Sequence, residues 1–128
     1  MQKLTLPATK TTFGVVFDAT SAKLELTGNS YPPNAMVFFE PLIHWLEEFV
    51  KEKPKEIMVI FRVNYFNTTS SKYIFKMLEL LDKYNKSKNK VKLLWYYSES
   101  EDDLYESWKA LISELDLAHQ LIHSENTA

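Results

Sequence analysis

Cysteine is absent from this chain of 128 residues, and glycine occurs only at Gly14 and Gly28. Without cysteine the protein has no disulfide, no thiol nucleophile and no thiolate metal site. Two isolated glycines cannot build the glycine-rich loops that cradle phosphates in Walker or dinucleotide-binding motifs. The sequence also has no apolar run that approaches the ~20 residues of a membrane-spanning helix. These absences exclude several common enzyme classes and argue against a helical membrane protein.

Neither sign of charge is in large surplus. Fifteen basic and seventeen acidic residues give a formal net charge of −2, which argues against a nucleic-acid binder because such proteins carry a basic excess. Residues 1–10 lack the apolar core of a secretory signal peptide, so we expect a cytoplasmic protein. The hydrophobic fraction of 45% and the charged fraction of 25% are typical of a globular chain. We expect one domain over residues 1–128 with a frayed tail at 124–128.

The apolar pattern predicts a hairpin followed by alternating helices and strands. The hairpin strands are expected at residues 13–18 and 23–28, and the turn-forming segment 28–34 is expected to be a loop. Apolar residues at helical spacing form three stripes: Phe38, Leu42, Trp45, Leu46, Phe49 and Val50; Ile74, Met77, Leu78 and Leu81; Leu104, Trp108, Leu111, Ile112 and Leu115. Pro41 predicts either a kink in the first helix or a start of the long helix at that residue.

Two segments between the helical stripes have the composition of interior strands. Residues 57–66 are nearly continuous in apolar side chains and are expected to be covered on both faces of the sheet, and residues 91–97 resemble them. Ser100 is the expected N-cap of the third helix, and residues 117–123 are a candidate edge strand. Strands joined by helices lie parallel with right-handed connections. The predicted fold is therefore α/β, with a mixed sheet of about four to six strands and helices packed on it.

A cluster of hydroxyl groups follows the segment 57–66. Residues Thr68 to Ser71 carry four consecutive hydroxyls on the first turn of the second helix, directly after Asn67. The free N–H groups and the dipole of a helix start favour a phosphoryl group at such a position. Lys72 is available to add a counter-charge. The alternative is that these polar residues only cap the helix, because Ser, Thr and Asn are the preferred N-cap residues.

Other polar residues are weaker candidates for chemistry. His119 and His123 have an i, i+4 spacing, but that spacing suits a metal only on a helix and no third ligand is near in sequence. The acidic run 99–103 is explained by the positive end of a helix dipole, and His44 by a partly exposed helix position. Arg62 and Asn64 interrupt the apolar segment and are expected to satisfy one another or the sheet edge, with a role near the hydroxyl cluster as the alternative. We expect no metal site.

Four segments together resemble the SiaC family of bacterial regulatory phosphoproteins. They are GNSYPPNA at 28–35, PLIHWL at 41–46, YFNTTSSK at 65–72 and LWYYSESEDD at 94–103. The segments occur in the order and spacing of the family, and the similarity spans about residues 5–120. The resemblance implies a fold similar to that of the anti-sigma-factor antagonists (STAS-like), no enzymatic activity and no cofactor.

The resemblance also implies a partner switch. In the family a threonine is phosphorylated by a cognate Ser/Thr kinase and dephosphorylated by a PP2C-type phosphatase, and the unmodified form binds and activates an effector such as a diguanylate cyclase in cyclic-di-GMP signalling. The motif places the phosphoacceptor at Thr68, with Thr69 as the second choice, and implies a binding surface made by Asn67, Thr69, Ser70, Ser71 and Lys72. The 28–35 segment either borders this site or is only a turn. A constitutive scaffold and, further away, a small enzyme are the alternatives.

Overall fold

A computed structural model describes residues 1–87, 90–97 and 102–123 of the chain. Six strands form one sheet in the order in which they occur along the chain. The elements are β1 (Leu4–Leu6), β2 (Gly14–Asp18), β3 (Lys23–Ser30), α1 (Ala35–Lys51), β4 (Glu56–Phe66), α2 (Thr68–Lys86), β5 (Lys90–Tyr97), α3 (Asp102–Ile112) and β6 (Ala118–His123). The first three strands pair antiparallel, and β3 to β6 pair parallel. The prediction of a mixed α/β sheet with a hairpin at its start is confirmed.

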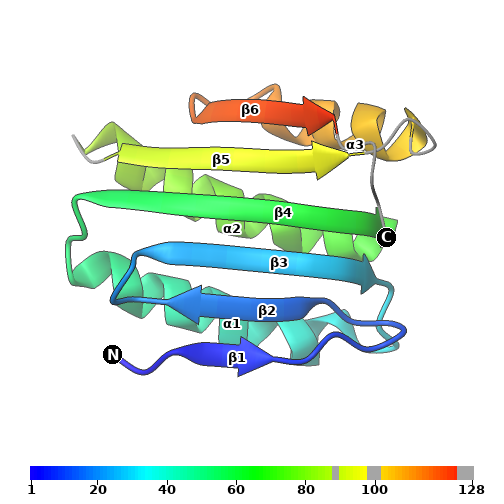
Figure 1. Ribbon diagram of the computed structural model, residues 1–128, viewed down its shortest axis with the longest axis horizontal. Helices are drawn as coiled ribbons and strands as arrows, with labels where there is room; N and C mark the ends of the chain where they lie inside the picture. Colours follow the sequence, from blue (N-terminus) through cyan, green and yellow to red (C-terminus); the bar gives the residue numbers. More distant parts are fainter. Residues whose placement is uncertain (88–89, 98–101, 124–128) are drawn as a thin grey trace.

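The three helices all lie on one face of the sheet (Figure 1). The expectation that the segment 57–66 is covered on both faces is therefore wrong. Along β4, Ile57, Val59, Phe61 and Val63 are buried, whereas Arg62 and Asn64 on the opposite face are exposed. Ile60 is only 5% exposed but stays outside the main core. It is flanked in the sheet by Glu25 and Leu94, so neighbouring strands cover it laterally.

The apolar stripe of α1 is shifted by one residue at its start. Phe39 is fully buried, and Phe38, which the periodicity had placed in the core, is only partly buried. The helix runs through Pro41 and starts six residues before it, so the alternative of a start at this proline is wrong. Pro41 lacks an N–H and leaves the carbonyl of Val37 without a helical partner. Val37 is 65% exposed, and water can satisfy that carbonyl.

The sequence analysis missed β1 and predicted β6. The strand β1 has three residues, too few for an apolar alternation to stand out. The strand β6 lies at the other edge of the sheet, parallel to β5, where residues 117–123 were expected to form an edge strand. The predicted cap Ser100 and the expected tail at 124–128 lie outside the described residues.

Aromatic stacking holds α3 on the sheet. The rings of Trp95 on β5 and Trp108 on α3 stack with centroids 3.9 Å apart and planes 17° apart. Phe61 on β4 packs against both rings, at 4.9 and 5.1 Å. Burying rings of this size contributes strongly to core stability. The carboxyl ends of β3 and β4 lie beside the start of α2, and this is the edge where sites gather in open α/β sheets.

Candidate functional site

Asn67 forms the whole connection between β4 and α2. Its backbone is extended, with φ −87° and ψ 176°, and its side-chain oxygen accepts a hydrogen bond from the N–H of Ser70 at 2.8 Å. The carbonyl of Asn67 accepts from the N–H of Ser71 at 2.9 Å. Asparagine therefore caps the helix. The alternative that the hydroxyl cluster serves as the cap is wrong for Thr68, which is the first residue inside α2.

Ser70 is buried and bonded to the end of β3. Its hydroxyl donates to the carbonyl of Ser30 at 3.1 Å, and the two Oγ atoms lie 2.7 Å apart. The same carbonyl accepts from the N–H of Asn67 at 3.0 Å. Both serines are fully buried. The 28–35 segment therefore borders the hydroxyl cluster, and Ser30 is a site residue that the sequence analysis did not single out, although it lies in a quoted motif.

The remaining hydroxyls differ in whether they have a partner. Ser71 donates to the carbonyl of Thr68 at 2.6 Å, a bond within the first turn of the helix. Thr68 and Thr69 are exposed. Over the residues that the structure describes, neither threonine hydroxyl takes part in a hydrogen bond. Two of the four hydroxyls are thus engaged by the fold, and the two threonines face solvent.

Thr68 and Thr69 lie on different sides of α2. Thr68 lines a cleft of about 560 Å³ between α2 and α3, together with Ser71, Lys72, Phe75 and Glu114 among others. Thr69 is not part of this lining. One turn further on, Tyr73 stacks on Phe39 of α1 at 5.2 Å, and residues four apart share one side of a helix. Thr69 therefore belongs to the side of α2 that faces α1, and Thr68 to the side that faces α3.

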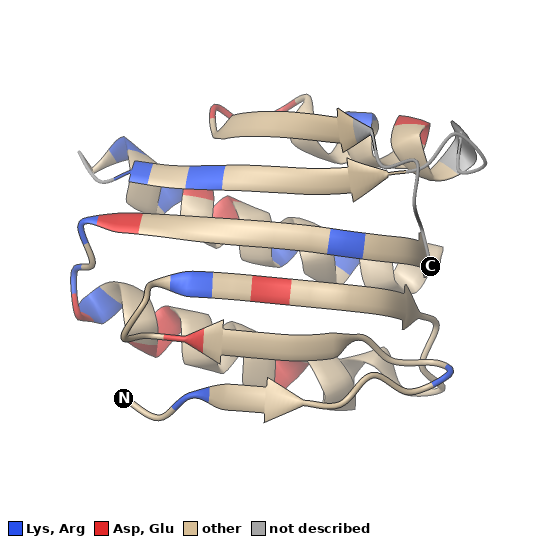
Figure 2. Ribbon diagram, in the orientation of Figure 1, with Lys and Arg blue, Asp and Glu red and all other residues tan. Residues whose placement is uncertain are grey.

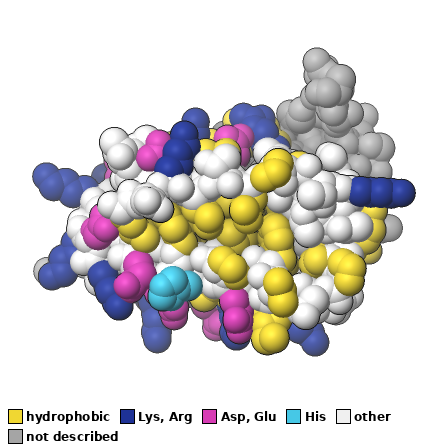
Figure 3. Space-filling view, turned by 90° about the horizontal axis from the view of Figure 1, so that it is seen from below, with side chains coloured by type: hydrophobic (Ala, Val, Ile, Leu, Met, Phe, Trp, Pro, Cys, Tyr) yellow, Lys and Arg dark blue, Asp and Glu magenta, His cyan; other side chains and the backbone are white. Residues whose placement is uncertain are grey.

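Exposed apolar side chains gather near the same edge of the sheet. Tyr31 directly follows β3, and Tyr65 is the next-to-last residue of β4. They are 38% and 49% exposed, and their rings contact edge to face with centroids 6.0 Å apart. Met36 and Val37 in the first turn of α1 are 49% and 65% exposed. Figure 3, seen from the side of β1 and α1, shows hydrophobic side chains gathered in the middle of that side of the molecule with charged groups around them. Clusters of this kind mark interaction surfaces.

Arg62 lies away from the hydroxyl cluster. Its Nε is 3.0 Å from an oxygen of Glu25, and its guanidinium lies 4.0 Å from the centre of the Tyr96 ring. Arg62 and Glu25 alternate with the buried residues of β4 and β3, which places them on the face of the sheet without helices. Figure 2 shows that charged residues are few along β3, β4 and β5. The expectation that Arg62 and Asn64 satisfy one another is wrong, because Arg62 is paired with Glu25.

Acidic and histidine residues do not assemble into a metal site within the described ranges, where no group of three or more potential ligands comes together. His119 and His123 lie on β6, and the Nδ1 of His119 is 3.1 Å from the carbonyl of Leu117. His44 is exposed on α1, and Glu99 and Glu101 of the acidic run lie outside the described residues. In the described part of the chain, no helix has the length and apolarity to cross a bilayer.

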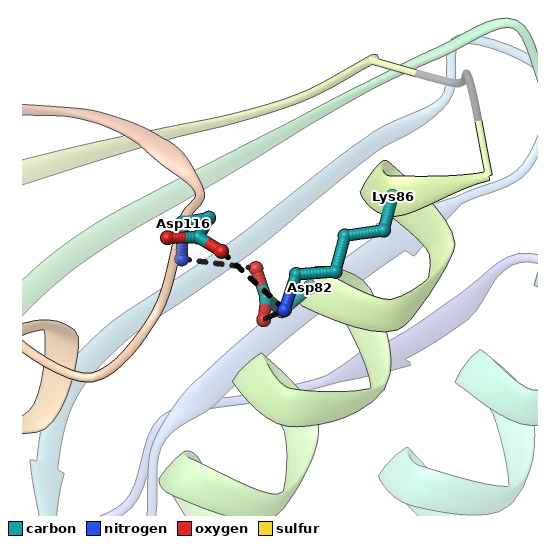
Figure 4. A network of polar contacts seen from close by, with 3 residues as sticks. All are labelled: Asp82, Lys86 and Asp116. Atoms are coloured by element: carbon teal, nitrogen blue, oxygen red, sulfur yellow. Dashed lines mark hydrogen bonds and ion pairs between the residues drawn. The ribbon is translucent and has the colours of Figure 1, made fainter.

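Asp82 is a buried acid that the sequence analysis missed. Its side chain accepts from the N–H of Asp116 at 3.1 Å, and Lys86 bridges the carboxylates of Asp82 and Asp116 at 3.3 and 3.4 Å (Figure 4). Hydrogen bonds to these two carboxylates raise the pKa of Lys86. The network joins α2 to the segment between α3 and β6. It lies about 21 Å along α2 from Thr68, given a rise of about 1.5 Å per residue, and so fixes the far end of the α2–α3 pair.

Comparisons with known proteins agree with this fold. The family model for the SiaC family regulatory phosphoprotein matches residues 6–124. An uncharacterized protein of Pseudomonas aeruginosa (strain UCBPP-PA14) is 29% identical over 106 residues, which cover 83% of this chain and 84% of that protein. The crystal structure of apo-SiaC from P. aeruginosa matches with a TM-score of 0.89 and 25% identity, over 95% of this chain and 99% of that one. A similar match, with a TM-score of 0.90 and 25% identity over 94% of this chain and 99% of that one, is to the P. aeruginosa complex of the diguanylate cyclase SiaD with its activator SiaC.

Proposed function

Because the chain belongs to the SiaC family of regulatory phosphoproteins, we propose that it is a phosphorylation-gated partner switch whose acceptor is Thr68. Its membership also means that the protein regulates others and is not itself an enzyme. The family similarity inferred from the four sequence segments is thereby confirmed. What the chain binds, and which residue carries the phosphate, form the content of the proposal.

The observation that carries the proposal is the unequal environment of the four hydroxyls. Ser70 is buried against Ser30, and Ser71 is bonded to a backbone carbonyl. Thr68 combines an exposed hydroxyl with a position on the rim of the α2–α3 cleft. Thr69 is equally exposed but faces α1, and it remains the second choice. A kinase can reach Thr68 without unfolding any part of the sheet.

Phosphate at Thr68 acts by charge. It adds about −1.5 to −2 charges and takes the formal net charge from −2 to about −4. A partner that docks over the first turn of α2 covers a neutral hydroxyl in the unmodified form and a bulky dianion in the modified form. Burying an unpaired dianion costs more than a few contacts offset, so the modified protein releases the partner. The switch needs no large change of shape.

The effector is proposed to be a diguanylate cyclase, which the unmodified form activates and so raises cyclic-di-GMP. Support comes from the P. aeruginosa SiaC, which is the activator of the diguanylate cyclase SiaD in their solved complex. The exposed rings of Tyr31 and Tyr65 at the same edge of the sheet as Thr68 offer a surface for such a protein partner. A cognate Ser/Thr kinase adds the phosphate to Thr68, and a PP2C-type phosphatase removes it.

Binding to the effector tests the proposal. The cyclase encoded in the same host is titrated with the wild-type protein and with Thr68→Ala, each before and after kinase treatment. We expect the unmodified protein and both Thr68→Ala samples to bind, and the phosphorylated wild type to lose binding. Equal binding by phosphorylated and unmodified wild type would instead establish the constitutive scaffold. Turnover of a small phosphorylated substrate by the purified chain would favour the small enzyme.

A further inference from the structure

Lys72 and Thr68 lie one helical turn apart on the same side of α2. Residues at i and i+4 on a helix are neighbours, with Cβ atoms about 5–6 Å apart, and both side chains line the α2–α3 cleft. Lys72 is exposed and, within the described part of the chain, takes part in no ion pair. Lys51 and Lys86, also on helices, are paired with carboxylates, whereas Lys76 and Lys109 lie over tyrosine rings and Lys83, like Lys72, is in no ion pair among the described residues. A charged side chain thus stands beside the acceptor without a partner of its own.

We propose, resting on the function proposed above, that Lys72 is the counter-ion of the phosphate on Thr68. Its ammonium group ion-pairs with the phosphate oxygens across one turn of α2, at the rim of the cleft. A phosphate has three acceptor oxygens, and a lysine with free rotation can meet any of them. The pair forms only after modification, so Lys72 has no structural task in the unmodified protein.

The surroundings assign this role to Lys72 and to no other side chain of the cleft. Of the described residues lining it, Lys72 is the one cation and Glu114, from the segment after α3, is the one anion. Asn67 carries no charge, and its side-chain oxygen already accepts from the N–H of Ser70. The N–H groups of Thr68 and Thr69, the first of α2, lack helical partners and also favour an anion. Lys72 and the helix start therefore act together on the phosphate, and Glu114 opposes them.

The pair has a consequence for how the switch depends on pH. A phosphothreonine has an ordinary second pKa of about 6. A cation within reach stabilises the dianion and so lowers the pKa of the phosphate. A larger share of the phosphate then keeps its second charge as the pH falls from neutral towards about 6, and release of the partner weakens less over that range. Removing the cation raises the pKa of the phosphate, so the second charge is lost at a higher pH.

The test measures the phosphate itself. Phosphothreonine is incorporated at position 68 during translation, so that no kinase is needed, and its ³¹P resonance is followed by NMR from about pH 4 to about pH 8.5, around its ordinary pKa. The proteins compared are the otherwise unchanged chain, Lys72→Met, Lys72→Gln, Lys72→Arg and Lys76→Met. Lys76 is the matched control, since it is also a lysine of α2 but lies eight residues from Thr68, or about 12 Å, which exceeds the Debye length of about 10 Å at about 0.1 M salt.

We expect Lys72→Met and Lys72→Gln to raise the pKa of the phosphate by about half a unit, the size of one screened charge at this distance. Lys72→Arg should restore the original value, and Lys76→Met should leave it unchanged. Salt at about 1 M should shrink the difference because it screens exposed charges. Identical titrations for Lys72→Met and the parent, or equal shifts for Lys72→Met and Lys76→Met, would overturn the assignment of Lys72. Tight effector binding by the phosphothreonine protein would overturn the switch itself, whatever the titrations give.

Discussion

The hydroxyls of Ser30 and Ser70 lie 2.7 Å apart although 40 positions separate them in the chain. Both side chains are fully buried. Their contact fastens the first turn of α2 to the end of β3, in addition to the helix cap that Asn67 provides. It explains why adjacent hydroxyls in one short segment have different tasks. Ser70 holds the helix in place, and Thr68, two residues earlier, remains free to be modified.

Loss of this contact should lower stability without moving the phosphorylation site. Ser70→Ala leaves the buried hydroxyl of Ser30 without its partner and should cost about 1–3 kcal/mol in the free energy of unfolding. Ser30→Ala should cost less, because the Ser70 hydroxyl keeps its bond to the carbonyl of residue 30. The double variant should cost less than the sum of the two single changes, because both remove the contact between the hydroxyls. Urea titrations of the three variants measure this. Additive losses would show that the two hydroxyls do not interact.

Phosphorylation should map to Thr68. Incubation with the cognate kinase should add one phosphate by intact mass, and fragmentation should place it on Thr68. Thr69→Ala should be modified as fully as wild type, and Thr68→Ala should not be modified. The reverse pattern would assign the acceptor to Thr69 and keep the switch. A phosphate on histidine or aspartate would contradict both the residue and the mechanism.

Removing the acceptor should not destabilise the protein. Thr68 is exposed and lies inside the helix that Asn67 caps, so Thr68→Ala should change the free energy of unfolding by no more than about 0.5 kcal/mol. Asn67→Ala removes the cap and should cost about 1 kcal/mol, within a range of about 0.5–2 kcal/mol. Thermal melts of the two neighbouring variants give the comparison. If Thr68→Ala melted as low as Asn67→Ala, the threonine hydroxyl would have a structural role.

A carboxylate at position 68 should weaken effector binding without lowering the stability of the fold. Thr68→Glu places an anion at a helix start, which contributes about 0.3–1 kcal/mol in favour of the fold. The variant should therefore keep or slightly raise its Tm and bind the effector more weakly than wild type. Loss is expected to be partial, because a carboxylate carries less charge and fewer acceptor oxygens than phosphate. Thr68→Gln is the control of similar size without charge, and it should bind more tightly than Thr68→Glu.

The bridge made by Lys86 should disappear at high pH. Its hydrogen bonds to Asp82 and Asp116 raise the pKa of Lys86 above its ordinary value of 10.5. A group with a raised folded pKa stabilises the fold fully below its unfolded pKa and loses that effect as the pH rises through the folded pKa. At a pH well below 10.5, Lys86→Met should have a lower Tm than wild type. At a pH above the raised pKa of Lys86, the difference in Tm between the variant and wild type should vanish. Lys83→Met, a change at another lysine of the same helix, should show no such dependence.

Much of the fold could be predicted because its signals are local. The stripe at Ile74, Met77, Leu78 and Leu81 is buried as its spacing requires, and the hairpin and the edge strand β6 lie where the pattern placed them. The one-sided sheet could not be predicted from β4 alone. The face of β4 without helices carries apolar residues such as Met58 and Ile60, so the composition of β4 matches that of a strand covered on both faces. Only the arrangement of the helices shows which face is covered.

The position of the site could be predicted from the sequence, but the different role of each hydroxyl group could not. The hydroxyl cluster at a helix start follows from residue types in sequence, and Asn67 directly before it is a preferred cap residue. The contact of Ser70 with Ser30 depends on the parallel register of β3 and β4, a long-range property that no local pattern carries. The same holds for Asp82, which appears in the sequence as one more charged residue of an amphipathic helix and is buried because the segment around Asp116 folds over it.

A single residue, Asn67, joins an eleven-residue strand to a nineteen-residue helix. A flexible peptide can adopt the extended conformation that the substrate groove of a kinase requires. Here the hydroxyl of Thr68, the proposed acceptor, follows the strand β4 by two residues, so the sheet fixes its position in space. We therefore expect the proposed kinase and phosphatase to recognise a folded shape, with a concave surface that fits around the end of a helix. Recognition by these enzymes then depends on three-dimensional complementarity. We expect a short peptide of residues 60–76 to be a much poorer kinase substrate than the intact protein.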